Sequence, residues 1–166
     1  AIFPSLPTSD AATYVDLGQK LSRGETYFIG GTYAYWPPGY PFLLGVLYYF
    51  VGYSEAAMLA LNIFIYGVTI WVVYGLAEHV LDDYSARVAT VLLTIWPNHF
   101  MAANGATKEY FLIPVLVGAV WLYLIAANST RWKRIIPLVA GGMALGYGAL
   151  IQPGSMLFIS AIIIYA

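Results

Sequence analysis

The sequence contains no cysteine and little charge. Its 166 residues include seven Lys and Arg and eight Asp and Glu, so charged side chains make up 9% of the chain, against about 25% in a soluble domain. The lack of cysteine excludes disulfides, thiolate catalysis and cysteine-bound metals. With a net charge of −1 and no clustered basic face, the chain also lacks the signature of a nucleic-acid-binding protein.

Apolar residues dominate instead. Hydrophobic side chains make up 61% of the chain, aromatic side chains 17%, and the mean hydropathy is +0.74, which together predict an integral membrane protein. The two histidines, His79 and His99, lie too far apart for a helix-borne metal pair, so we expect no metal ligands among the site residues. Whether a divalent metal ion acts as a cofactor stays open at this point.

The apolar stretches predict an all-α, polytopic bundle of transmembrane helices, because about 20 residues in a helix cross the hydrocarbon core. The predicted spans are residues 56–77, 88–103, 110–127, 135–151 and 155–166. Gln152, Pro153 and Gly154 separate the last two, and the final one is cut off by the end of the chain. We therefore expect a fragment of a larger membrane protein.

Residues 1–55 precede the first predicted span and differ from it in pattern. In the segment SDAATYVDLGQKLSRG, Tyr14 and Leu17 share one helical face while Asp16 and Lys20 share the other, which predicts an amphipathic helix beside the membrane. The prolines of Trp36–Pro41 predict a rigid, non-helical elbow, followed by a re-entrant or interfacial helix over residues 42–51. The loops 78–87 and 128–134 are basic and short, so the positive-inside rule places them in the cytoplasm and residues 1–55 outside.

Several motifs then carry a family resemblance. In chain order they are Asp10, Tyr14, residues 17–24, Trp36-Pro37-Pro38-Gly39-Tyr40-Pro41, Ser54-Glu55, Thr107-Lys108-Glu109 and the glycine-rich run GMALGYGALIQP at residues 142–153. Together they resemble the polytopic lipid-phosphosugar glycosyltransferases of the GT-C class, in the branch similar to protein O-mannosyltransferases and aminoarabinose transferases. Two positions depart from that pattern: Ala11 stands where a second acidic residue is frequent, and Gln152 where arginine is frequent.

The resemblance implies transfer of a sugar from a polyprenyl-phosphate carrier to an acceptor hydroxyl at the outer face of the bacterial plasma (inner) membrane. Asp10 is the expected base, since it begins a helix but lies off the solvated face, and Glu109 is expected to position the acceptor or the base. The expected substrate-binding residues are Lys108, which would meet a phosphate, with Tyr14, Trp36 and Gln152. If Asp10 is the base, it should face a cavity shared with Lys108-Glu109 and Gln152. Membrane lipid, lipid-linked sugar and other membrane subunits are the expected partners.

Simpler roles compete with each of these. Asp10 is also placed as a helix cap, Lys108 and Glu109 as interfacial anchors, and Tyr14 as a residue packed beneath its own helix. A second function is a non-catalytic accessory or scaffold subunit that keeps a GT-C-like fold, favoured by Ala11 and Gln152. A transporter is disfavoured because the clearest predicted spans carry no internal charge.

Overall fold

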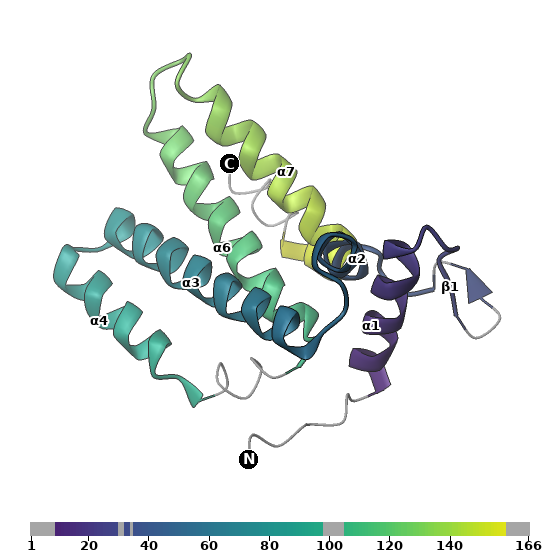
Figure 1. The fold of residues 1–166 in the computed structure, drawn as a ribbon. Coiled ribbons are helices and arrows are strands. Elements are labelled where there is room, and N and C mark those ends of the chain that lie inside the picture. The colour runs from purple at the N-terminus through teal and green to yellow at the C-terminus, as the bar shows by residue number, and fades with distance from the viewer. Residues whose placement is uncertain (1–8, 30–31, 34, 98–104, 159–166) are drawn as a thin grey trace.

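The computed structural model describes residues 9–29, 32–33, 35–97 and 105–158 (Figure 1). The helices are α1 (Ser9–Ser22), α2 (Gly39–Val51), α3 (Glu55–Val80), α4 (Asp83–Thr94), α6 (Lys108–Ala127) and α7 (Ile135–Ile151). A two-stranded antiparallel hairpin, β1 (Phe28–Ile29) and β2 (Thr32–Tyr33), pairs Phe28 with Tyr33. Apart from this small hairpin the described fold is all-α, which confirms the expected fold class.

Two helices, α3 and α6, are long and apolar enough to cross a membrane, with 26 and 20 residues. Helix α3 starts cleanly because the Ser54 hydroxyl accepts a hydrogen bond from the Ala57 amide at 3.0 Å. Helix α7 has 17 residues and α2 has 13. The span expected over residues 88–103 begins earlier, as α4, which ends at Thr94 after 12 residues; residues 98–104 lie outside the described part of the chain.

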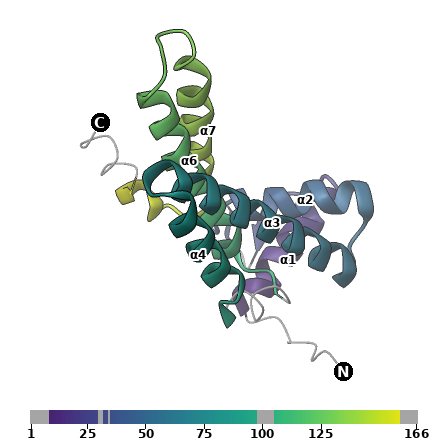
Figure 2. The ribbon, with the colours of Figure 1, turned by 90° about the vertical axis from the view of Figure 1, so that its left-hand side faces the viewer.

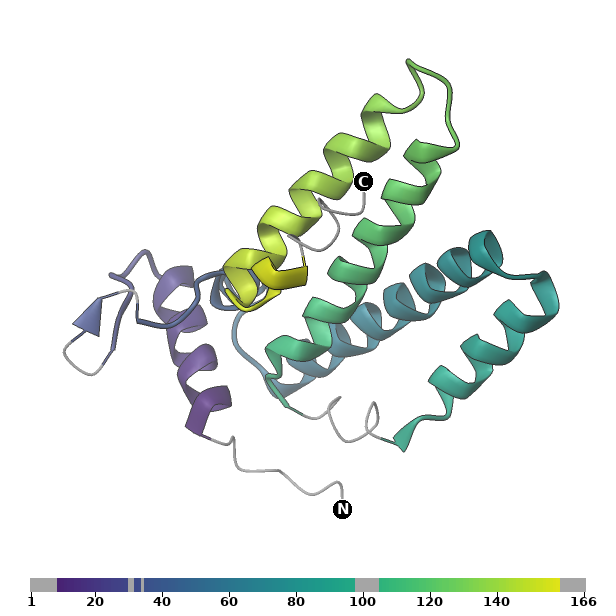
Figure 3. The ribbon, with the colours of Figure 1, turned by 180° about the vertical axis from the view of Figure 1, so that it is seen from behind.

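The long helices form two antiparallel pairs, α3 with α4 and α6 with α7, and α3 also packs against α6 (Figures 1 and 3). Contact between α3 and α6 is close where Gly75 faces Trp121, because any larger side chain at Gly75 would overlap the indole ring. The starts of α3 and α6 and the end of α7 lie toward the same end of the bundle as α1 and α2, and residues from all five helices belong to or pack against one buried cluster there (Figures 1 and 2). This end, called the α1 end below, brings together segments far apart in sequence.

The predicted amphipathic helix is present as α1, and it crosses α2 at close range. Tyr14, Leu17 and Gly18 are buried on the face toward α2. A methyl group at Gly18 would lie 2.7 Å from Cβ of Leu44, so glycine is needed for this approach. The helix ends at Ser22, and Gly24 in the turn that follows has a φ of 70°, which suits a residue without a side chain.

The elbow before α2 is shorter than predicted. Helix α2 begins at Gly39, so Pro41 lies in its first turn and the non-helical segment covers only residues 35–38. The first main-chain bond of the helix runs from the Phe42 amide to the Pro38 carbonyl at 2.9 Å. Proline at position 41 is tolerated because the first amides of a helix have no acceptor within it. Treating every proline in the motif as a helix breaker was therefore wrong for Pro41.

Candidate functional site

An aromatic cluster centred on Tyr14 lies in the buried core of the α1 end. The Tyr14 ring meets Trp36 edge to face at 5.5 Å between centroids and Tyr40 in the same way at 5.6 Å. Tyr14 and Tyr40 are almost fully buried, whereas Trp36 is half-buried. Burial raises the pKa of Tyr40, and nearby Tyr48 and Glu109 raise it further, so this phenol stays neutral.

The first residue of α6 places a positive charge on this cluster. The Lys108 ammonium lies over the Tyr14 ring, 5.6 Å from its centroid, in a cation–π arrangement worth about 0.5–2 kcal/mol. Glu109 follows in the same helical turn and is exposed. The charges of Glu109 and Asp10 both act on the ammonium group. Three predicted site residues, Tyr14, Trp36 and Lys108, are thus brought together from separate elements.

Asp10 lies in the first turn of α1, one turn before Tyr14, with its side chain exposed. The positive end of the helix dipole favours a carboxylate at this place. The predicted cavity, shared by Asp10 with Lys108-Glu109 and Gln152, finds no support here, because the Asp10 side chain is exposed and its charge acts on Lys108 from the surface. Tyr14 is only 2% exposed, so its ring supports Lys108 from below and is not open to a ligand.

The contact between α2 and α7 closes the other side of the α1 end. The Tyr147 hydroxyl donates a hydrogen bond to the Gly39 carbonyl at 2.8 Å, although the two residues are 108 positions apart. Gly39 also lies directly against the main chain of Ile151. Gln152 is the residue directly after the end of α7, and its side chain is half-buried. Its Oε1 accepts no hydrogen bond from the described residues. Gln152 therefore borders the cluster from α7.

Tyr27 fixes the elbow that carries Trp36. Its hydroxyl donates to the carbonyl oxygens of Trp36 and Pro37, at 2.9 and 3.3 Å. Burial raises the pKa of Tyr27 to about 12, and nearby Tyr14 adds to the shift. Neither this residue nor Tyr147 is predicted as a site residue from the sequence. For Tyr147, a lone aromatic between two glycines in α7 is the signal that points to a tertiary contact.

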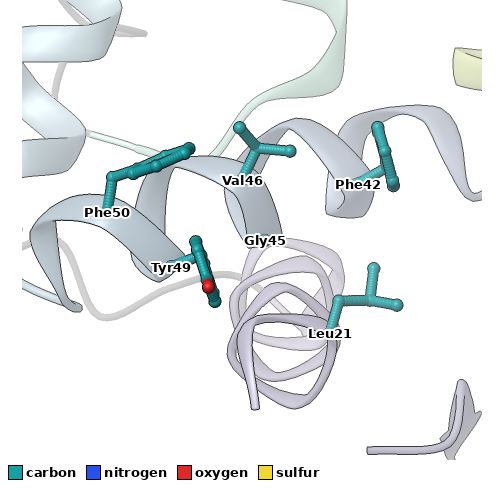
Figure 4. A pocket seen from close by; sticks show the side chains of 6 residues that line it. All are labelled: Leu21, Phe42, Gly45, Val46, Tyr49 and Phe50. Atoms are coloured by element: carbon teal, nitrogen blue, oxygen red, sulfur yellow. The ribbon is translucent and has the colours of Figure 1, made fainter. Parts of the chain in front are cut away.

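A separate apolar hollow lies between the end of α1 and the outer face of α2 (Figure 4). Its volume is about 200 Å³, and the lining residues are Leu21, Phe42, Gly45, Val46, Tyr49 and Phe50. None of the predicted site residues is among them. Apart from the Tyr49 hydroxyl, the side chains that line this hollow are apolar, and none of them carries a charge.

Metal binding finds no support in the described part of the chain, which contains no group of three or more His, Asp or Glu side chains suited to a metal ion. His79 instead lies 2.9 Å from the side-chain amide of Asn128, where it ties the end of α3 to the end of α6. His99 lies outside the described residues. Among the predicted site residues, the charged groups that act on one another beside Tyr14 are Asp10, Lys108 and Glu109.

Comparison with known proteins identifies one family. Residues 36–166 match the family model for dolichyl-phosphate-mannose-protein mannosyltransferase. No curated protein and no solved structure matches the chain. Trp36, Lys108, Glu109 and Gln152 fall inside the matched range, while Asp10 and Tyr14 precede it.

Proposed function

The chain belongs to the dolichyl-phosphate-mannose-protein mannosyltransferase family of membrane glycosyltransferases, and on this premise we propose that it forms part of an enzyme using a polyprenyl-phosphate sugar. The sugar passes to an acceptor hydroxyl at the outer face of the membrane. The observation that carries this proposal is the cation of Lys108, held over Tyr14 beside Trp36 at the α1 end. At a membrane surface, a lipid phosphate is an anion that this ammonium group can bind.

The proposed reaction is a displacement at the anomeric carbon. The acceptor oxygen bonds to that carbon while the bond from carbon to phosphate oxygen breaks, which inverts the configuration. The electron pair of the broken bond stays with the lipid phosphate, whose charge Lys108 offsets. The hydroxyl proton passes to the carboxylate of Asp10. Glu109, exposed in the first turn of α6, orients the acceptor.

Trp36 and Gln152 complete the proposed binding region. The half-buried Trp36 indole offers apolar surface beside Lys108 for a sugar ring, and Tyr27 holds the main chain that carries it. Gln152 is proposed to contribute from the end of α7, where its side chain is half-buried and its Oε1 accepts no hydrogen bond from the described residues. Tyr14 contributes from below by supporting Lys108.

The test is an Asp10→Asn variant of the full-length protein, assayed in membrane vesicles with radiolabelled polyprenyl-phosphate mannose as donor. Asparagine also suits a helix start, so we expect normal expression with transfer reduced by about 10²–10⁴-fold. Asp16→Asn is the matched control. It removes the ion pair with Lys20 at 2.9 Å, worth only a few tenths of a kcal/mol at an exposed site, and should keep most activity.

A non-catalytic accessory subunit is the second candidate, and the exposure of Asp10 favours it. Under this alternative the fold is retained, but the carboxylate does no chemistry. Asp10→Asn and Asp16→Asn would then behave alike, and neither would change transfer. That result would refute the role of Asp10 as a base.

A further inference from the structure

Asn62 is a buried polar side chain within the membrane-spanning helix α3. It is 2% exposed, and its Nδ2 donates a hydrogen bond to the Gly105 carbonyl at 3.1 Å, across 43 positions in the sequence. An amide in an apolar environment is costly unless it is hydrogen-bonded. Its presence in a mainly apolar span therefore needs a reason, and its hydrogen bond reaches the residue that lies shortly before the start of α6.

One turn further along α3, Tyr66 makes a second set of contacts on the same face. Its hydroxyl donates to the Thr94 carbonyl at the end of α4, at 2.7 Å, and its ring stacks on Tyr110 at 6.3 Å. Residues 62 and 66 are four apart and so lie one above the other on a helix. This face of α3 is thus hydrogen-bonded to the end of α4, at Thr94, and to Gly105, shortly before the start of α6.

The segment anchored by Asn62 leads directly to the site. Gly105 is followed by Ala106, which is 3% exposed and belongs to the same buried cluster as Tyr14 and Tyr40. Helix α6 starts two residues later with Lys108. The ammonium lies 5.6 Å from the Tyr14 centroid, close to the limit of about 6 Å for a cation–π contact. A shift of the helix start by about 1 Å would therefore separate Lys108 from its support.

We propose that Asn62 is a positioning residue that fixes the start of α6 and thereby holds Lys108 over Tyr14. This inference rests on the proposed function, in which Lys108 meets the lipid phosphate. Asn62 itself is nearly inaccessible, and its bond to the main chain at Gly105 is the contact through which it acts on α6. The buried bond makes the position of a surface cation depend on a residue inside the span.

The first test is kinetic and uses Asn62→Leu, which keeps the size of the side chain but removes the donor. We expect a rise in KM for the polyprenyl-phosphate donor of about tenfold, since the loss of one contact to a charged group lowers affinity by about that factor or more. In a Lys108→Met background, Asn62→Leu should add little, because both changes remove the same interaction. Full additivity of the two changes would overturn the proposal. Asn62→Ala makes the same test with a smaller side chain if the leucine variant fails to reach the membrane.

Thr69→Val is the matched control in the same helix. Thr69 is equally buried, but its hydroxyl donates to Ile65 of α3 itself, at 2.8 Å, and does not reach α6. We expect the donor KM of this variant to stay at its original value. A rise equal to that of Asn62→Leu would mean that any lost polar group in α3 disturbs the enzyme, and would refute a specific role for Asn62.

A second test does not depend on activity. The 166 residues contain no cysteine, so Ala106→Cys introduces a single thiol among them, at a buried position. Alkylation by N-ethylmaleimide should be slow in this variant, clearly faster when Asn62→Leu is added, and slow when Thr69→Val is added. Continued protection with Asn62→Leu would overturn the positioning role. Faster alkylation with an unchanged donor KM would support positioning of α6 while refuting the phosphate contact proposed for Lys108.

Discussion

Replacing Gly39 by alanine tests the contact between α2 and α7 that closes the α1 end. A methyl group at Gly39 would lie 2.7 Å from the amide nitrogen of Ile151 and 2.7 Å from the carbonyl carbon of Leu150. These are main-chain atoms, so no side-chain rotation relieves the overlap. The helices must move apart, and the 2.8 Å bond from the Tyr147 hydroxyl to the Gly39 carbonyl is then strained or lost.

The expected cost follows from these two effects. Overpacking costs about 1–3 kcal/mol and a lost hydrogen bond about 1 kcal/mol, while alanine returns at most about 1 kcal/mol through its higher helix propensity. We expect a net loss of about 1–3 kcal/mol, seen as a lower Tm of the purified protein in detergent. Gly67→Ala is the control, because a methyl group there meets nothing within 4 Å. If Gly39→Ala melts at the same temperature as Gly67→Ala, the proposed close contact between α2 and α7 is wrong.

Two further predictions concern the elbow and the topology. Tyr27→Phe should lower the free energy of unfolding by about 1 kcal/mol at neutral pH. Because the pKa of Tyr27 is raised from 10.0 to about 12, this difference in stability from the original protein should persist up to about pH 10 and vanish as the pH passes 12. A pH-independent difference in Tm would contradict this account. Cysteines at Ser22 and Ser129 should differ toward an impermeant reagent in intact cells, Ser22→Cys reacting and Ser129→Cys not, and equal labelling would refute the proposed orientation.

Local sequence patterns predicted those helices in which both the apolar run and the capping or terminating residues are present in the sequence. Helix α3 has a mainly apolar sequence after Ser54, which caps it, and Gly24 has the positive φ that is typical of a residue just after the end of a helix such as α1. The family expected from the ordered motifs is confirmed by the match over residues 36–166. These signals are read within about one helical turn or from motif order, and both are present in the sequence itself.

Long-range contacts at the site could not be predicted in the same way. The bonds from Tyr27 to Trp36 and from Tyr147 to Gly39 depend on how the elements pack, which no local pattern encodes. The role of Asn62 is not predictable from the sequence, because a single amide leaves the surrounding stretch apolar enough to be predicted as a span. The division into an external segment over residues 1–55 and spans beyond it stays a prediction.

The charges at the α1 end explain why ionisable residues precede the first span. On α1, Asp16 pairs with Lys20 at 2.9 Å, and Arg23 just after the helix pairs with Glu25 at 2.6 Å, so these four charges largely cancel within the segment. Asp10 and Lys108 are different, because neither forms an ion pair with any residue that the structure describes. Under the proposed mechanism, a direct pair between them would occupy the carboxylate proposed to take a proton and the ammonium proposed to meet an anion. Keeping Lys108 on the Tyr14 ring holds it near Asp10 while leaving both charges available to a substrate.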